Sequence, residues 1–550
     1  MISPLRHGCK GIQSIITTVI LFCLLLILLV SIKTPFKIYD EGSVVFNATR
    51  IMNGDVPYRD FWAIYPPGQF YSLATLFRIF GTTLFVVRIY DTIVRFVIVI
   101  SLYFIAKKIT SRPLALLVCI FSTLLLASAR FYAYPVFPSM ALILLSFLSL
   151  FEYYNTKLRR WLFLTGVLTG ISVLFRWDIG LYSFISVIMT IVLFHFFYVM
   201  NETKSSGKIF FVISEQVFIL SFGVLLFVLP FYGYWCLRSG FNNLWSQIVT
   251  FPALVHRDLR WKPYPSIIPP LIPLNLGLLG IRINYPKFLN WLQFYLPIVV
   301  YCIAIIHFFI LLIKKRLSFN IQFFGSTALL FLGVLLFAQA LSRYDYIHIL
   351  PSSIIALLIL IFLVDRLLLI LKNLVIKYSF ILLLTLFIFI YFISPVRILL
   401  YTINNFSPFG CYSNIERAGC VYIRKDQEQA VEYIRAHTKN SESIFVGNRR
   451  HDIIFLNDIG FYFLSNRPSA TKYHELFPGV ATTLLIQEVI VRDIELKNVN
   501  WIVFFNEPES GEPNASSVYS GVHFLDDFIH SEYAPVTEFG SYGIWNKRAN

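Results

Sequence analysis

Charged residues are scarce in this chain of 550 residues. They make up 14% of the sequence, whereas a soluble domain carries roughly 25%. So few charges cannot cover a globular surface, which excludes an ordinary soluble protein. Disorder is excluded as well, because 55 Phe, 31 Tyr and 9 Trp are present. With 57% hydrophobic residues and a mean hydropathy of +0.70, the composition predicts a polytopic α-helical membrane protein.

Acidic residues are the scarcest charges, and they are unevenly distributed. Residues 1–400 contain 33 Lys and Arg but 12 Asp and Glu, whereas residues 401–550 contain 13 and 18. The net charge of +16 therefore arises in the apolar part, where it indicates membrane topology and not binding to nucleic acid. We predict a membrane domain over residues 1–395 and a soluble α/β domain over residues 396–550.

Several cofactor motifs are missing. The sequence has no Cys/His cluster with metal-ligand spacing, no P-loop, no GxGxxG after a strand and no serine nucleophile elbow. Functions that depend on ATP or a nicotinamide cofactor are therefore disfavoured.

Long apolar runs are abundant, by contrast. A spanning helix needs about 20 apolar residues, and about eleven runs approach or reach this length. They lie at 14–32, 85–106, 113–129, 138–151, 161–175, 179–199, 209–233, 291–313, 320–341, 349–371 and 378–395.

Basic clusters occur at every second connection between these runs. They are Arg6 and Lys10, then Lys107, Lys108 and Arg112, then Lys157, Arg159 and Arg160, then Lys204 and Lys208, then Lys314, Lys315 and Arg316, then Arg366, Lys372 and Lys377. The positive-inside rule places these connections and the N-terminus on the cytoplasmic side of a cell membrane. Eleven spans then place the C-terminal domain outside.

Two outside loops, 33–84 and 234–290, are too long for simple turns. Residues 42–53 and 68–80 of the first loop are predicted to form short helices along the membrane surface. In the tail, helices are predicted at 426–438 and 482–496, and buried strands at 443–447 and 501–505. Cys411 and Cys420 would pair in an oxidising compartment, although two free thiols fit equally well.

Acids beside cations recur at the outer ends of the spans. The segments are KIYDEG (37–42), PYRDFW (57–62), FRWDIG (175–180), VHRDLRWK (255–262) and SRYDYIH (342–348). A single Arg-x-Asp at a span end is more often a structural ion pair. Five such segments on one side favour a shared outward-facing cavity.

An acid, several cations and a membrane suit one kind of chemistry. The carboxylate of an acidic residue can deprotonate the hydroxyl or amine of an acceptor. Arg and His can hold a phosphate as it leaves. Transfer of a sugar from a lipid phosphate to an acceptor outside the bilayer fits this combination.

The stretch 38–71 resembles the first outside loop of the GT-C membrane glycosyltransferases, in the group of protein O-mannosyltransferases and aminoarabinose transferases. The shared pattern is an acidic pair after the first span, then G-x-x-P-Y-x-D and P-P-G. It comprises Asp40 and Glu41, then Gly54, Pro57, Tyr58 and Asp60, then Pro66, Pro67 and Gly68. The resemblance implies a GT-C-like helical fold, a polyprenyl-phosphate-linked monosaccharide donor and an inverting reaction.

The resemblance also implies roles for individual residues. The catalytic candidates are Asp40, Glu41 and Asp60, and Asp40 is favoured as the base because it lies nearest the span end. The candidates for the donor phosphate are Arg176, Arg343, His348, Arg59 and Lys262. Relatives often have Lys where Arg176 stands, and Arg343, Asp345 and His348 resemble an R-x-D-x-x-H signature of bacterial members.

The sequence leaves open other functions and the question of whether the protein binds a metal ion. A lipid-linked glycan flippase or transporter, or a ligase or polymerase of pyrophosphate-linked glycans, would also need an outward cationic cavity. No cofactor is certain. Some GT-C enzymes need a divalent metal, for which Asp60 is a candidate ligand, although an ion pair with Arg59 or another cation is favoured. The expected partners are the lipid-linked donor, an extracytoplasmic acceptor and the bilayer, and not nucleic acid.

Overall fold

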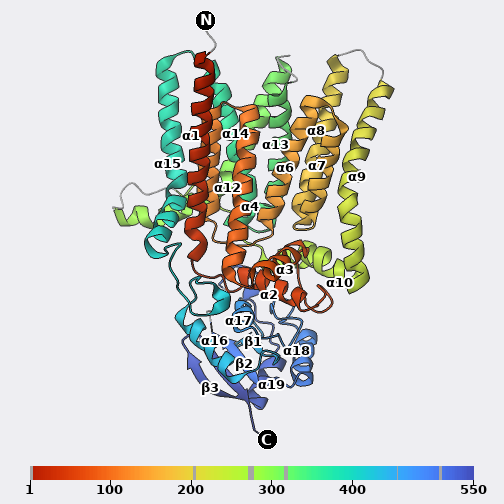
Figure 1. The fold of residues 1–550 in the computed structure, drawn as a ribbon, viewed down its shortest axis with the longest axis vertical. Coiled ribbons are helices and arrows are strands. Elements are labelled where there is room, and N and C mark those ends of the chain that lie inside the picture. Colours follow the sequence, from red (N-terminus) through yellow and green to blue (C-terminus); the bar gives the residue numbers. More distant parts are fainter. Residues whose placement is uncertain are drawn as a thin grey trace.

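The computed structural model describes residues 4–201, 206–270, 278–314, 320–454, 456–506 and 511–549. Lys204, Lys315, Arg316 and part of the 234–290 loop lie outside these ranges. Long helices stand side by side in one layer, short helices lie crosswise at one end of it, and a small α/β domain packs below them (Figure 1). The N-terminus lies at the opposite end of the layer from this domain (Figure 1). We call the end that carries the domain the C-domain side.

The helical layer matches the predicted apolar runs, each of which lies largely within one helix. The helices are α1 (Pro4–Leu29), α4 (Leu84–Ile109), α5 (Arg112–Ser128), α6 (Val136–Thr156), α7 (Arg159–Val173), α8 (Trp177–Asn201), α9 (Ser206–Ser239), α12 (Leu278–Ile313), α13 (Ile321–Ser342), α14 (Tyr346–Ile370) and α15 (Leu374–Asn405). Among the described residues, nine helices are long and apolar enough to cross a membrane. Because α5 and α7 have only 17 and 15 residues, the count of eleven spans stays a prediction.

Both predicted surface helices are present on the C-domain side, as α2 (Asp40–Met52) and α3 (Gly68–Phe80). The second long loop forms α10 (Phe241–Trp245), a π-helical stretch (Ser246–Val255) and α11 (His256–Arg260). The P-P-G motif has a structural reason. The Gly68 N–H donates to the Leu174 carbonyl over 3.0 Å, and a Cβ on Gly68 would lie 2.4 Å from that oxygen. This close approach fixes the chain just before Arg176.

The C-terminal domain has a four-stranded sheet in the order β1-β2-β4-β3, in which the β1–β2 pair is parallel and the other pairs are antiparallel. Its elements are α16 (Lys425–His437), β1 (Phe445–Asn448), α17 (Gly460–Ser465), α18 (Leu484–Leu496), β2 (Trp501–Phe505), α19 (Phe524–Glu532), β3 (Tyr533–Phe539) and β4 (Tyr542–Lys547), with the single turns η3 (Glu416–Ala418) and η4 (Ala515–Ser517).

Alternating side chains of β2 bury both faces of this sheet. Val503 and Phe505 belong to the apolar cluster that includes α16 and α17, whereas Ile502 and Phe504 pack with α18 and α19. A period of two therefore gives the domain three layers. The helices and strands predicted from the tail are all present.

The first loop and the C-terminal domain share one core. Side chains of α2, α3, α17 and the sheet form a single buried cluster. A Cβ on Gly42 of α2 would lie 2.5 Å from the Gly460 nitrogen at the start of α17, and that N–H donates to the Ile38 carbonyl over 2.9 Å. The backbones of α2 and α17 thus lie in direct contact.

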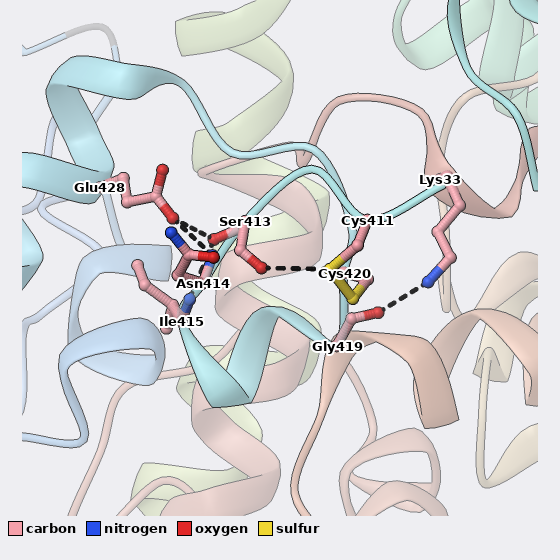
Figure 2. The surroundings of a disulfide bond; sticks show 8 residues. All are labelled: Lys33, Cys411, Ser413, Asn414, Ile415, Gly419, Cys420 and Glu428. Carbon is pink, nitrogen blue, oxygen red and sulfur yellow. Dashed lines mark hydrogen bonds between the residues drawn. A yellow bond between two sulfur atoms is a disulfide. The ribbon is translucent and has the colours of Figure 1, made fainter. Parts of the chain in front are cut away.

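A disulfide lies between α15 and the domain. Cys411 and Cys420 are joined, and the Lys33 ammonium donates to the Gly419 carbonyl over 2.8 Å (Figure 2). Lys33 ends the short 3₁₀ turn η1 (Val30–Lys33) that follows α1. The disulfide loop therefore holds the start of the domain against the end of the first helix.

Candidate functional site

A cavity of about 630 Å³ lies on the C-domain side of the helical layer. Its wall combines the start of α2, the 64–66 segment, the start of α8, the α11 region, the α13–α14 connection and three segments of the C-terminal domain, at residues 456, 475–477 and 512. Four of the five acid–cation segments predicted to converge contribute to it. The PYRDFW segment does not, although the nearby residues 64–66 do.

Five of the eight candidate site residues line this cavity, namely Asp40, Arg176, Lys262, Arg343 and His348. Glu41, Arg59 and Asp60 do not line it.

Asp40 is the first residue of α2 and is half-buried in the cavity wall. Within the described part of the chain, its carboxylate has no hydrogen bond or ion pair. Burial raises the pKa of Asp40 above its ordinary value, the nearby Lys37 opposes the rise, and the charge of Asp345 adds to it. A carboxylate with a raised pKa and no partner is suited to accept a proton.

Glu41 points elsewhere, because consecutive residues of a helix are rotated by about 100°. Its two oxygens each accept a hydrogen bond of 2.8 Å from the buried Arg88 guanidinium of α4. Arg88 also donates to the Thr34 carbonyl over 2.6 Å and to the Ile32 carbonyl over 3.1 Å. This buried pair ties the chain after α1 to α4.

Arg59 and Asp60 form an exposed pair on the first loop. The arginine Nε and Nη2 donate to the two Asp60 oxygens over 2.9 and 2.8 Å, and the Val56 N–H donates to one of them over 2.7 Å. The hydrogen bond from Arg59 lowers the pKa of Asp60. These contacts correspond to the ion pair that the sequence favoured over a metal ligand.

Arg176 and Asp178 flank the start of α8. The Arg176 Nη2 and Nε lie 2.6 and 2.9 Å from the two Asp178 oxygens, and Gln339 of α13 donates to the same carboxylate over 2.9 Å. The Arg176 guanidinium also lies 5.5 Å from the centre of the Tyr65 ring. Arg176 is thus held rigidly at the cavity wall.

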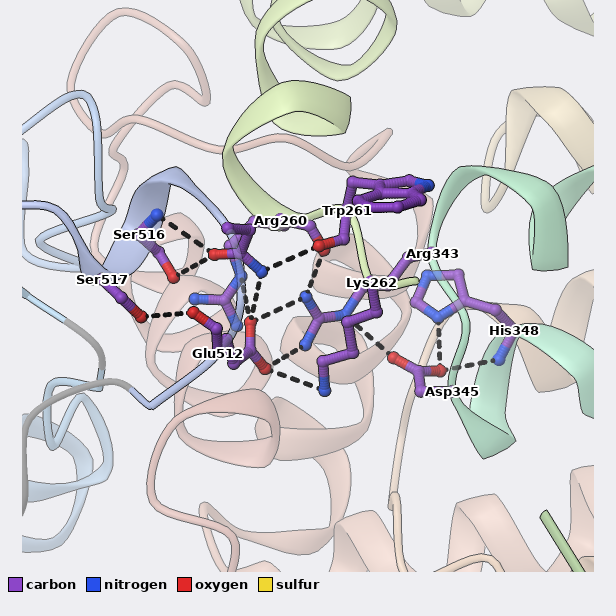
Figure 3. A network of polar contacts seen from close by, with 10 residues as sticks. Arg260, Trp261, Lys262, Arg343, Asp345, His348, Glu512, Ser516 and Ser517 are labelled. Carbon is purple, nitrogen blue, oxygen red and sulfur yellow. Dashed lines mark hydrogen bonds and ion pairs between the residues drawn. The ribbon is translucent and has the colours of Figure 1, made fainter. Parts of the chain in front are cut away.

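A cluster of three cations, Arg260, Lys262 and Arg343, lies at one side of the cavity (Figure 3). Arg343 Nε donates to Asp345 over 2.9 Å, and its Nη1 donates to the Arg260 carbonyl over 2.6 Å. The remaining Asp345 oxygen lies 2.6 Å from the His348 Nδ1. Asp345 therefore orients both members of the R-x-D-x-x-H signature.

Glu512 of the C-terminal domain lies among these cations. Its Oε1 lies 2.7 Å from Arg343 Nη2 and 2.8 Å from Lys262 Nζ, and its Oε2 lies 3.7 Å from Arg260 Nε (Figure 3). Burial alone would raise its pKa, but the hydrogen bonds from Arg343 and Lys262 outweigh this and lower the pKa of Glu512 to about 2.

Glu475 is a second acid that the domain contributes. Ser43 and Asn47, one turn apart on α2, donate to its Oε1, the amide over 3.2 Å. Burial raises the pKa of Glu475 to about 7. His256 of α11 also lines the cavity, and burial together with His348 lowers its pKa to about 3.

Four cavity residues, Arg260, His256, Glu475 and Glu512, were not among the candidates from sequence. Arg260 and His256 lie in the VHRDLRWK segment, so the clustering of charges near Lys262 was a usable signal. No such signal marked Glu475 and Glu512, because acidic residues are common in a soluble domain.

Among the described residues, one group could hold a metal ion. It comprises Asp452, His523 and Asp526 of the C-terminal domain, and none of these lines the cavity. Arg450 already donates to both Asp452 oxygens over 2.9 and 2.7 Å. The metal dependence expected of some relatives therefore stays untested.

Comparison with known proteins supports the family resemblance. Residues 64–222 match the sequence profile of the dolichyl-phosphate-mannose-protein mannosyltransferase family. A search of the curated proteins finds no match.

Solved structures share the fold along almost the whole chain. The crystal structure of ArnT from Cupriavidus metallidurans bound to undecaprenyl phosphate is similar with a TM-score of 0.55 and 11% identity, over 99% of this chain and 98% of that one. The apo state gives a TM-score of 0.51 and 13% identity, over 98% of both chains. The chain thus has the GT-C-like architecture predicted from its sequence, and its resemblance to this glycosyltransferase group is confirmed.

Proposed function

We propose that this protein is an inverting glycosyltransferase that moves a monosaccharide from a polyprenyl phosphate to an acceptor outside the cell membrane. One observation carries the proposal. A single cavity at the edge of the helical layer contains the cations Arg176, Arg260, Lys262 and Arg343 together with Asp40, whose carboxylate has no partner in the part of the chain that the structure describes. The similarity to glycosyltransferases, and to an ArnT that binds undecaprenyl phosphate, supports this reading.

The proposed reaction begins with Asp40. Its carboxylate accepts the proton of the acceptor hydroxyl or amine as that group attacks the anomeric carbon of the sugar. The bond from this carbon to the phosphate oxygen breaks, and the polyprenyl phosphate leaves with the electron pair. Attack from the face opposite the phosphate inverts the anomeric configuration. Because burial raises the pKa of Asp40, the carboxylate is a stronger base than an exposed aspartate.

The cations act on the leaving group. Phosphate gains negative charge as the bond breaks, and guanidinium and ammonium groups fixed in advance stabilise that charge most effectively in a site shielded from water. Arg176 and Arg343 are each held by an acid two residues further on, so they are already oriented before the donor binds. A phosphate leaving group requires no general acid.

The location of the cavity suits a lipid donor. It lies where long apolar helices meet the crosswise helices and the C-terminal domain, so the prenyl chain can stay in the bilayer while the phosphate enters the cavity. The basic clusters favour a cytoplasmic N-terminus, and the C-terminal domain lies at the opposite end of the layer. We therefore place the reaction on the outer side of the cell membrane.

Lipid-linked sugars in cells that lack the gene test the proposal. We expect a polyprenyl-phosphate monosaccharide to accumulate in mass spectra of the lipid extract, and an envelope component to lose one sugar. Plasmid-borne wild type and an Asp527→Asn variant, altered at an exposed site of the C-terminal domain, should reverse both changes, whereas Asp40→Asn should not. Accumulation of pyrophosphate-linked oligosaccharides instead would contradict the proposal and favour a ligase, polymerase or flippase.

A further inference from the structure

The cation cluster of the cavity already holds an anion that belongs to the protein. Arg260 and Lys262 come from the second long loop and Arg343 from the α13–α14 connection, yet all three converge on Glu512 (Figure 3). A carboxylate that accepts hydrogen bonds at both oxygens from guanidinium and ammonium groups makes the contacts that a phosphate would make.

Within this cluster, Arg343 does not depend on Glu512 for its position. Arg343 is held independently by Asp345 and by the Arg260 carbonyl. Its Nη2 donates to Glu512 alone among the described residues. The arginine would thus keep its place and gain a free donor if the glutamate withdrew.

We infer that Glu512 occupies the position of the donor phosphate and competes with it, so that the segment 511–517, which we call the strap, withdraws when the donor binds. This inference rests on the proposed function, which requires a phosphate in this cavity. One N–H cannot donate fully to two anions at once, and like charges at contact distance repel. The strap therefore sets the donor affinity of the site.

The attachment of the strap suits such a movement. The Asn514 amide donates to the Trp261 carbonyl over 3.0 Å, and within the strap Ser517 donates to the Glu512 carbonyl over 2.5 Å. The strap has one single helical turn, η4, and its residue Ser516 is buried. The hydrogen bonds named here are polar, and water can replace them when the segment moves.

The first test compares affinities for undecaprenyl phosphate, the lipid product of the proposed reaction, which carries the same phosphate and prenyl chain as the donor. Undecaprenyl phosphate is titrated into purified full-length protein in lipid nanodiscs, with wild type, Glu512→Gln and Glu512→Asp. Glu512→Gln keeps the shape of the side chain but removes its charge, so we expect binding to tighten by about tenfold or more, which corresponds to about 1.4 kcal/mol. Glu512→Asp keeps the charge and should stay close to wild type. Glu538→Gln, which removes an exposed partner of Arg449 in the same domain, is the matched control.

The results separate this inference from the proposed function. If wild type and Glu512→Gln both fail to bind undecaprenyl phosphate, the proposed function is wrong. If wild type binds and Glu512→Gln binds equally well or more weakly, Glu512 does not compete with the donor and the inference is overturned.

A second measurement needs no change at Glu512. A single cysteine at Ser516 should react slowly with maleimide while the strap is closed, and several times faster with saturating undecaprenyl phosphate. A cysteine at the exposed Val518 is the control, and its rate should not change. A Ser516→Cys rate that stays constant or falls on addition of the lipid would also overturn the inference.

Discussion

Glu41 and Arg88 form two hydrogen bonds of 2.8 Å in a fully buried site, one residue along the chain from an aspartate that has no partner among the described residues. The acidic pair after the first helix thus contains two acids in opposite situations. Because α2 rotates by about 100° per residue, Asp40 lines the cavity while Glu41 points to α4. We therefore expect different consequences from replacing each of them.

Asp40→Asn should lower turnover by a factor of about 10²–10⁴, the usual contribution of a general base. Donor binding should be largely kept, because the amide preserves the size of the side chain. Thermal stability should be equal or higher, since the wild-type carboxylate is half-buried and pairs with none of the described residues. Single-turnover kinetics, undecaprenyl phosphate binding and thermal unfolding check these expectations. Near-normal turnover would remove Asp40 as the base.

Glu41→Gln should act on stability. It leaves the buried Arg88 cation without its counter-charge, and breaking a buried pair in this way costs roughly 3–5 kcal/mol. We expect a lower apparent Tm and less folded protein in the membrane. Replacing both residues, Glu41→Leu with Arg88→Met, should recover much of the loss. A stable but inactive Glu41→Gln enzyme would instead show that Glu41 takes part in the chemistry.

Arg176→Ala and Arg343→Ala should weaken donor binding. Each removes one charge-assisted contact, worth roughly 1.5–3 kcal/mol, or about 10- to 150-fold in affinity. Arg176→Lys should recover part of this loss, because a point charge still attracts phosphate without the bidentate fork. Affinity for a polyprenyl-phosphate sugar is measured on variants of matched Tm, with the exposed Arg449→Ala as the control. Unchanged affinity in both alanine variants would leave only a structural role.

Glu475 predicts a pH dependence of stability. Its pKa is about 7 in the folded protein and close to 4.5 in the unfolded chain. Between these values the unfolded chain releases a proton that the folded protein keeps, so the stability present below pH 4.5 is lost as the pH rises to 7, by up to about 3 kcal/mol. Glu475→Gln does not titrate in this range. The difference in Tm, wild type minus variant, should therefore fall from pH 5 to pH 8, and parallel curves would show that Glu475 does not titrate in this window.

Sidedness is tested by labelling with a membrane-impermeant maleimide in a background that keeps only the disulfide cysteines. Asp527→Cys in the C-terminal domain should react in intact cells. Lys157→Cys and Lys372→Cys, both exposed at the other end of the helical layer, should react only after permeabilisation. The reverse pattern would invert the topology and place the cavity in the cytoplasm.

Much of the architecture could be predicted because apolar length and charge at span ends are local signals. Arg176, Lys262, Arg343 and His348 were placed in one cavity because topology brings every second connection to the same side. This reasoning needs no knowledge of how the helices pack.

The parts of the site that the sequence did not predict depend on packing between residues far apart in the chain. Glu475 contacts Ser43, 432 residues away, and no pattern in a soluble domain distinguishes it from other acids. The different roles of Asp40 and Glu41 could have been predicted only from the partner of Glu41, which is Arg88, a charged residue near the start of an apolar run. Such a charge needs a partner in the membrane, so its presence was a signal that the sequence did contain.

The packing of α17 on α2 has a consequence for the order of events during synthesis. The helix that carries Asp40 leaves the ribosome about 430 residues before Glu475, and at about 5–20 residues per second this is an interval of roughly 20–90 s. During that time Gly42 has no Gly460 to contact, and the cavity lacks the wall that the last domain supplies. We therefore expect a nascent or truncated chain that is already inserted in the bilayer to lack the proposed activity. The cavity is complete only once the segments that carry Glu475 and Glu512 have been made and have folded.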